Sequence, residues 1–294
     1  MKKLLALLLA LLLVPAAFAE APAAPLLQVH QLMIGFADAY LIRLGDVDIL
    51  MDGGNANPKT PTDDVVNYLR DAGVDTLDAV IITHWHLDHC MNLNAALTEF
   101  GTADTVVYSP ADSVPAEIDN GSVVVEIGPL VTGVHQQMKM GDVLTFGGMT
   151  LTCIGPEKLS MNGGANVDSL NILLQYGQRR FLFTGDYAQS GCINGPYAEL
   201  CANVEVLKFP HHGSTPYEIG NKASRTVRPR HVLVPGVASK HKIWDFFDDL
   251  GVKFPRENIY TNADGHVVIL TDGGDIFDVR TQQNPADYAP TNVT

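Results

Sequence analysis

Short apolar runs separated by turn-forming residues cover most of the chain, and this pattern indicates a β-rich protein with a few helices. Helices are expected where apolar residues recur every three or four positions, over residues 60–72, 91–100 and 241–250. The segment 109–128 is rich in Pro, Asp and Gly and is expected to form a loop. Strands are expected at residues 26–30, 39–44, 47–51, 77–83, 106–108, 143–146, 149–154, 169–176, 180–183, 204–208, 231–234, 259–260, 266–270 and 275–279. Groups of strands alternate with helices and the order repeats in outline, so two sheets packed face to face with helices outside would fit.

The amino-terminal residues carry the features of a secretory signal peptide. Lysines at positions 2 and 3 precede an apolar stretch over residues 4–14, and small residues follow up to Ala19. This apolar stretch is short against the roughly 20 residues that span a bilayer, so a retained membrane anchor is disfavoured. We therefore predict a secreted or extracytoplasmic protein. Its parts would be a signal peptide over residues 1–19, a flexible lead-in over 20–26, one domain over 27–280 and a tail over 281–294.

The charge balance bears on the class of substrate. The whole chain has a net charge of −14, and loss of the two leader lysines would leave 17 basic against 33 acidic residues, a net charge of −16. Such a surface repels polyanions, so long nucleic acids are disfavoured as partners and a small molecule or a head group is favoured. In an exported protein Cys192 and Cys201 could form a local disulfide, whereas Cys90 and Cys153 are expected to be buried thiols.

One polar segment concentrates most of the candidate chemistry. The apolar run at 79–82 leads into His84, His86, Asp88 and His89, so that three histidines and one carboxylate fall within six residues. Alternate side chains of an extended chain share one face, so the first three would point the same way, and a turn could bring His89 beside them. Imidazole and carboxylate groups that converge at a strand end favour a divalent metal ion of the first transition row.

Two later segments supply groups that could complete this site. Asp186 follows the apolar strand at 180–183, and its two carboxylate oxygens could bridge two cations. His211 and His212 follow a later strand in a turn that includes Ser214. Adjacent side chains on an extended chain point opposite ways, so one histidine of the pair is expected to bind metal. The other, with Ser214, would orient substrate or support a ligand, and the assignment within the pair stays open.

Together these segments resemble the metallo-β-lactamase superfamily. His84-Trp85-His86-Leu87-Asp88-His89 matches its HxHxDH motif. The layout is more similar to the hydrolase domain of ComEC-type competence proteins and their freestanding secreted relatives, and phosphorylcholine esterases of the superfamily also look similar. The motifs that carry this resemblance lie within residues 27 to 279 and are Leu50-Met51-Asp52-Gly53-Gly54, Asn166-x-x-Ser169-Leu170, Phe183-Thr184-Gly185-Asp186 and Leu207-Lys208-x-Pro210-His211-His212-Gly213-Ser214.

The resemblance implies an α/β fold, the αββα sandwich of the metallo-β-lactamase fold, with a site for two divalent metal ions, usually zinc or manganese. By the resemblance, His84 and His86 would hold the first ion, Asp88 and His89 the second, Asp186 would bridge them, and the His211-His212 element would complete the second ion.

Two departures from the superfamily pattern narrow the resemblance. Typical β-lactamases and thiol-ester hydrolases carry another histidine in a Pro-Gly-His context, but the matching place here reads Ile154-Gly155-Pro156-Glu157. ComEC-like relatives also lack this histidine, which implies a first ion with fewer protein ligands and more water. His241 lies near the family's late Gly-His-Pro, and with Ser214 it is a candidate substrate-binding residue, although lysines flank it on both sides.

We therefore predict a secreted metal-dependent hydrolase of phosphodiesters that acts through a metal-activated water, with Asp88 or Asp186 accepting the proton. The first alternative is an acyl hydrolase, a lactonase or a β-lactamase-like enzyme, and the absent histidine counts against it. The second is a non-catalytic metal-binding module that has kept the fold. The intact HxHxDH motif together with Asp186 counts against this alternative.

Overall fold

The computed structural model describes residues 25–54, 63–119, 124–126, 134–188, 195–214, 219–236 and 239–282. The expected signal peptide, the expected helix start at residues 60–62, Cys192 and residues 283–294 lie outside this part of the chain. The signal peptide and the disulfide between Cys192 and Cys201 therefore stay predictions. No helix within the described ranges is long and apolar enough to cross a bilayer.

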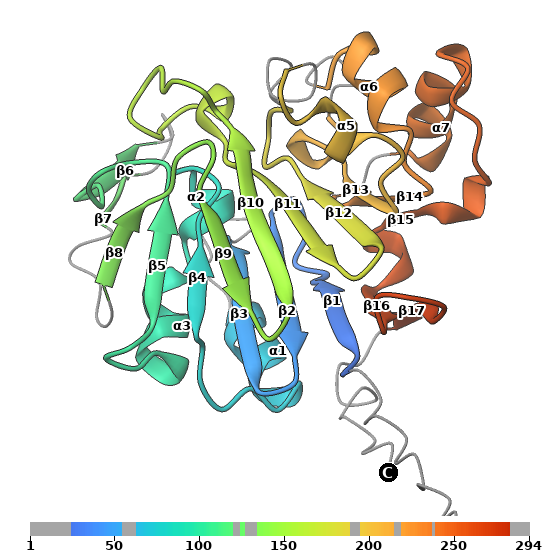
Figure 1. Ribbon diagram of the computed structural model, residues 1–294. Helices are drawn as coiled ribbons and strands as arrows, with labels where there is room; N and C mark the ends of the chain where they lie inside the picture. Colours follow the sequence, from blue (N-terminus) through green and yellow to red (C-terminus); the bar gives the residue numbers. More distant parts are fainter. Residues whose placement is uncertain are drawn as a thin grey trace, which may run out of the picture.

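Two mixed sheets make up most of the fold (Figure 1). One has eight strands in the order β17-β16-β1-β2-β3-β4-β5-β8, the other has seven in the order β15-β14-β13-β12-β11-β10-β9, and β6 pairs with β7 separately. The strands are β1 (Leu27–Gln31), β2 (Ala39–Leu44), β3 (Val47–Gly53), β4 (Ala79–Ile81), β5 (Val106–Ser109), β6 (Glu117–Asp119), β7 (Val124–Glu126), β8 (Val134–Gln137), β9 (Val143–Phe146), β10 (Met149–Gly155), β11 (Asn171–Tyr176), β12 (Arg179–Phe183), β13 (Val206–Lys208), β14 (His231–Val234), β15 (Ile259–Thr261), β16 (His266–Thr271) and β17 (Phe277–Gln282). The helices are α1 (Asp64–Asp71), α2 (Leu87–Cys90), α3 (Leu93–Phe100), α5 (Ala198–Cys201), α6 (Asn221–Val227) and α7 (Lys240–Asp249), with short 3-10 turns that include η1 (Asn166–Asp168) and η2 (His211–Gly213).

Each sheet combines an antiparallel part with a parallel part. In the first sheet β17, β16, β1, β2 and β3 pair antiparallel, whereas β3, β4, β5 and β8 run parallel. In the second sheet β9 to β12 pair antiparallel, whereas β12 to β15 run parallel. Parallel strands end at one edge of their sheet, and loops at such an edge commonly carry the functional site. The loops after β3, β4, β12 and β13 therefore lie where a functional site is expected.

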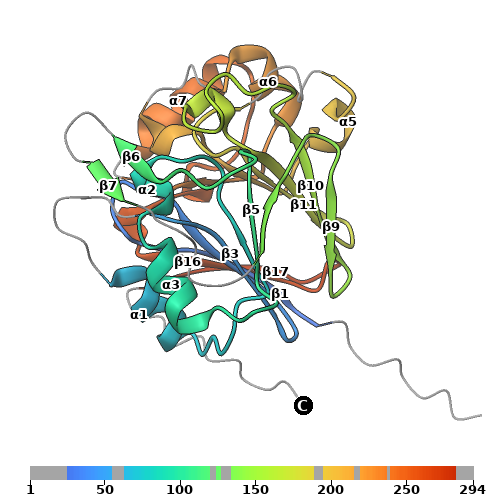
Figure 2. The ribbon, with the colours of Figure 1, turned by 90° about the vertical axis from the view of Figure 1, so that its left-hand side faces the viewer.

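The apolar core lies in three layers that match the expected αββα order. Tyr40 and Phe181 belong to the layer between the sheets, Leu69 and Leu97 join α1 and α3 to the first sheet, and Phe247 joins α7 to the second. Figure 2 shows α1 and α3 on one side of the sheets and α5, α6 and α7 on the other. Helices of ten residues or fewer are marginal in isolation, so this buried contact, about 1.5–3 kcal/mol for each large apolar side chain, holds them in place.

The middle of the chain differs from the expectation in three ways. The segment 109–128, expected to be a loop, contains β6 and β7, and β8 then adds an edge strand to the first sheet. Strands of three or four residues are too short to show a clear alternating pattern. The short helices α5 and α6 were also not expected. Finally, α2 forms over Leu87–Cys90, so Asp88 lies on a helical turn and not on the extended chain that we expected for it.

Candidate metal centre

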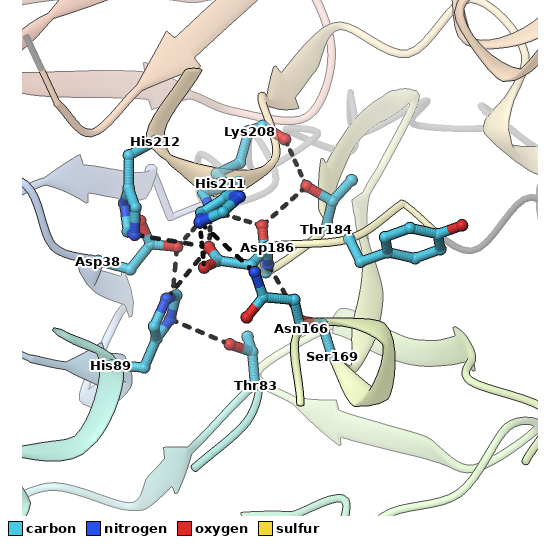
Figure 3. Close-up of polar contacts among 12 residues, drawn as sticks. Asp38, Thr83, His89, Asn166, Ser169, Thr184, Asp186, Lys208, His211 and His212 are labelled. Atoms are coloured by element: carbon cyan, nitrogen blue, oxygen red, sulfur yellow. Dashed lines mark hydrogen bonds and ion pairs between the residues drawn. The ribbon is translucent and has the colours of Figure 1, made fainter. Parts of the chain in front are cut away.

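Six of the predicted ligands meet where the carboxyl ends of parallel strands from both sheets converge. The segment after β4 brings His84, His86, Asp88 and His89, the loop after β12 brings Asp186, and the turn after β13 brings His212. Their ligand atoms form two groups of neighbours, one made of His84, His86 and Asp186, the other of Asp88, His89, Asp186 and His212. Asp186 belongs to both groups. Figure 3 shows Asp186 beside His89 and His211.

The first half-site consists of His84, His86 and one oxygen of Asp186. Nε2 of His84 lies 3.1 Å from Nδ1 of His86 and 3.8 Å from Oδ2 of Asp186. Nε2 of His86 lies 3.1 Å from the carbonyl oxygen of Gly164, and Nδ1 of His84 lies 3.3 Å from the Ser169 hydroxyl oxygen. A ring nitrogen that faces an acceptor carries the proton. The carbonyl of Gly164 can only accept, which leaves Nδ1 of His86 free to bind an ion, and Nε2 of His84 is free in the tautomer whose Nδ1–H donates to Ser169.

The second half-site uses the other oxygen of Asp186. Oδ1 of Asp186 lies 3.1 Å from Nε2 of His89 and 3.6 Å from Nε2 of His212. Nε2 of His212 also lies 3.2 Å from Oδ2 of Asp88. Because one oxygen of Asp186 faces each half-site, this carboxylate has the placement of a bridge between two cations.

Two buried carboxylates orient the histidines of the second half-site from behind. Asp52 lies 2.9 Å from Nδ1 of His89, and Asp38 lies 3.1 Å from Nδ1 of His212. Asp52 is itself held by Thr83, whose backbone N–H and hydroxyl each donate to it at 2.7 Å. Such carboxylate–histidine pairs fix the ring and its tautomer in metal sites. The structure thus provides both the groups that face an ion and the groups that orient them.

The burial and charge of the cluster fit divalent cations. Among the described residues, two buried pairs are in contact at 3.1 Å without the geometry of a hydrogen bond, namely Nε2 of His89 with Oδ1 of Asp186 and Nδ1 of His212 with Oδ1 of Asp38. Burial alone would raise the pKa of Asp186, but His89 and Lys208 outweigh it and hold this pKa well below its usual range. Burial would lower the pKa of His212, yet Asp38 and Asp88 raise it to about 9. Without metal, protons on imidazoles balance the carboxylates, and a cation would replace them.

The remaining predicted residues lie at the rim or away from the cluster. His211 is 30% exposed, and its Nε2 lies 3.9 Å from Oδ2 of Asp186 and 3.4 Å from Nδ2 of Asn166. Ser214 is exposed, and its hydroxyl donates to the backbone carbonyl of His211. The structure therefore directs His212 into the second group and leaves His211 at the mouth of the first. His241, predicted to bind substrate, projects from α7 with its ring 64% exposed and 3.2 Å from Asp245, outside both groups.

No role was expected for Asp38, Asp52 or Lys208 from the sequence, although all three are buried within the cluster. Asp52 and Lys208 stand inside two of the motifs quoted above, and Asp38 follows Gly35 in the connection between β1 and β2. The signal that could have found them is a charged residue placed inside or just beyond an apolar strand, because burial of a charge requires a partner.

Comparison with known proteins places this centre in a family. A sequence profile described as the Metallo-beta-lactamase superfamily matches residues 33–214. ComE operon protein 3 of Bacillus subtilis (strain 168) is 24% identical over 172 residues, which is 58% of this chain and 21% of that protein. The chain thus spans about a fifth of the length of this curated relative.

A solved structure shares the fold at low sequence identity. The metallo-β-lactamase fold protein YhfI from Bacillus subtilis superposes with a TM-score of 0.54 at 15% identity, over 83% of this chain and 100% of that one. A diphosphatase of the PhnP family gives a TM-score of 0.49 at 11% identity, over 87% of this chain and 100% of that one. The profile match covers more than half of the chain, and the predicted αββα fold is confirmed. The chain belongs to the metallo-β-lactamase superfamily and carries the His/Asp metal cluster of its metal-dependent hydrolases.

Proposed function

We propose that this hydrolase cleaves phosphodiesters. The observation that carries the proposal is the placement of Asp186, which offers Oδ1 to one half-site and Oδ2 to the other. Two cations that share a carboxylate suit an in-line displacement at phosphorus, because one can face the attacking oxygen and the other the leaving oxygen. The two predicted cations are zinc or manganese.

The residues of the two half-sites would have distinct tasks. Bound divalent ions would lower the pKa of a coordinated water from about 16 toward about 7 and offset the charge of the phosphoryl oxygens. The first half-site has three protein groups, which leaves room for water and a substrate oxygen. Asp88 is 31% exposed whereas Asp186 is 1% exposed, so Asp88 is the carboxylate better placed to exchange a proton with solvent.

The rim of the first half-site suits a phosphoryl group. His211 lies part-exposed beside Oδ2 of Asp186, Asn166 lies 3.4 Å from His211, and both side chains have N–H groups that can donate a hydrogen bond to a phosphoryl oxygen. The acidic charge of the chain favours a small phosphodiester or a phosphodiester head group over long nucleic acid. The expected export signal would place this activity outside the cytoplasm.

A substrate panel on protein of known metal content tests the proposal. Bis-(p-nitrophenyl) phosphate, p-nitrophenyl phosphate, a lactone and a β-lactam would be compared on one preparation, before and after removal of metal. We expect turnover of the diester that disappears with the metal and returns on addition of zinc or manganese. Full diester turnover by metal-free protein would contradict the proposal. Faster turnover of the lactone or the β-lactam would replace it by the acyl-hydrolase alternative.

A further inference from the structure

Lys208 is a buried charge at the end of β13, and its side chain is only 1% exposed. Its ammonium lies 2.5 Å from Oδ2 of Asp38 and donates to the carbonyl oxygen of Gly185 at 2.6 Å. It also lies 3.6 Å from Oδ1 of Asp186, the oxygen that faces the second half-site. Figure 3 shows Lys208 entering the cluster from the side opposite Thr83. Lys208 is not a metal ligand itself, and its ammonium contacts two carboxylates of the cluster, those of Asp38 and Asp186.

Packing does not explain an ammonium in this place. Taking a charge out of water is costly, and apolar residues of similar volume often replace a buried ion pair without loss of stability. The neighbouring strand residues Val206 and Leu207 show that β13 otherwise buries apolar side chains. The charge of Lys208 is therefore better explained by what it orients than by what it stabilises.

The contacts of Lys208 lead to one ligand of the second half-site. Asp38 uses Oδ2 for Lys208 and turns Oδ1 toward Nδ1 of His212 at 3.1 Å. His212 then presents Nε2 to Asp88 and Asp186. Without the ammonium, Oδ2 of Asp38 would lose its nearest cation and would be drawn toward His89, whose Nδ1 lies 3.8 Å away. The carboxylate could then no longer hold the His212 ring in one orientation.

We propose that Lys208 is a positioning residue of the second half-site, which acts through Asp38 to keep Nε2 of His212 directed at the second metal ion. The proposal rests on the metal cluster and not on the phosphodiester substrate. Loss of a group that orients a ligand typically weakens metal binding by about 10–100-fold. The second ion should be affected more strongly than the first, because the first half-site shares only Asp186 with the groups around Lys208.

The test compares Lys208→Met with Arg43→Met in the full-length protein. Arg43 forms another largely buried ion pair, with Nε 2.6 Å from Asp48, and it lies outside both ligand groups. Both variants are expected to lower the melting temperature. Zinc titration should show two ions bound with similar dissociation constants in the wild type and in Arg43→Met. In Lys208→Met the dissociation constant of the second ion should be about 10–100-fold higher. Cobalt substitution should show the corresponding loss of the second-site absorption bands.

Asp38→Asn separates the two halves of the proposal and replaces Lys208→Met if that variant does not fold. It keeps the shape of the side chain, removes the charge that links Lys208 to His212, and should weaken the second ion similarly. In the Asp38→Asn background, Lys208→Met should add no further weakening. Wild-type dissociation constants for both ions in Lys208→Met or in Asp38→Asn would overturn the proposal. A wild-type protein that binds a single ion would also overturn it. None of these readouts depends on which ester is cleaved.

Discussion

Gly54 lies where the chain leaves β3 and passes against the backbone that carries Asp88 and His89. A Cβ atom at this position would lie 1.9 Å from the carbonyl carbon and oxygen of Asp88 and 2.4 Å from the backbone nitrogen of His89. Ordinary contact begins near 3.4 Å, so the two segments would have to separate by about 1.5 Å. The atoms in the way are backbone atoms, which cannot rotate aside as a flexible side chain could.

Gly54→Ala is therefore expected to displace two ligands of the second half-site at once. A misplacement of about 1 Å in a catalytic group can cost about 100-fold in rate, so turnover should fall by at least that factor. Overpacking typically costs about 1–3 kcal/mol, which for a chain of this length lowers the melting temperature by roughly 2–12 °C. The second metal ion should bind more weakly for the same geometric reason.

The neighbouring Gly53→Ala is the matched control. A Cβ atom there would meet only a side-chain carbon of Leu50, at 3.5 Å, and Gly53 has no left-handed conformation to lose. Zinc content, diester turnover and calorimetric melting temperature would be measured on both variants and the wild type. Two tightly bound ions in Gly54→Ala, with turnover within about twofold of Gly53→Ala, would refute the argument that this close approach sets the ligand positions.

Three further predictions follow from the same geometry. His86→Ala and Asp186→Ala should each abolish diester turnover while circular dichroism shows a folded protein, and an active Asp186→Ala would exclude the bridging role. His241→Ala should change kcat/KM less than twofold because its ring is exposed, whereas a large rise in KM would restore the substrate-binding role predicted from sequence. Burial, and to a smaller extent the charges of Arg43 and His266, lower the pKa of His30 from 6.5 to about 3, so folding favours the neutral form of this histidine. The stability that the neutral form contributes is present above pH 6.5 and is lost as the pH falls toward 3. Urea unfolding should therefore show that His30 alone lowers the free energy of unfolding by up to about 3 kcal/mol between pH 7 and pH 4. His30→Gln should lack this loss, and equal losses in the variant and the wild type would contradict the prediction.

The layered fold and most of the metal-facing residues could be predicted because both correspond to patterns among neighbouring residues in the sequence. A buried strand such as 79–82 is visible as an apolar run, and the histidines that follow it are neighbours in the chain. The hairpin of β9 and β10 is visible for a similar reason, since Gly147 and Gly148 both adopt the positive φ that its tight turn requires.

The buried groups that orient the ligands could not be predicted because the residues that contact one another are distant in sequence. Asp38 and Lys208 approach within 2.5 Å only after the two sheets have packed together. Each residue taken alone has an ordinary alternative as a surface charge. The choice between His211 and His212 was likewise open, because it depends on a turn geometry that Pro210 and Gly213 permit but do not specify.

The turn that carries His211 and His212 has a strained backbone. On an extended chain they would point to opposite faces, but His211 and His212 both adopt left-handed conformations, with φ of 49° and 53°. Asp52, at the end of β3, does the same with φ of 55°. Such conformations cost about 1–3 kcal/mol each for residues other than glycine and persist only where surrounding contacts enforce them. Here those contacts are the Asp38 carboxylate for His212 and the Thr83 donors for Asp52. Because these groups also orient metal-facing nitrogens, the same interactions that hold the strained turns build the second half-site.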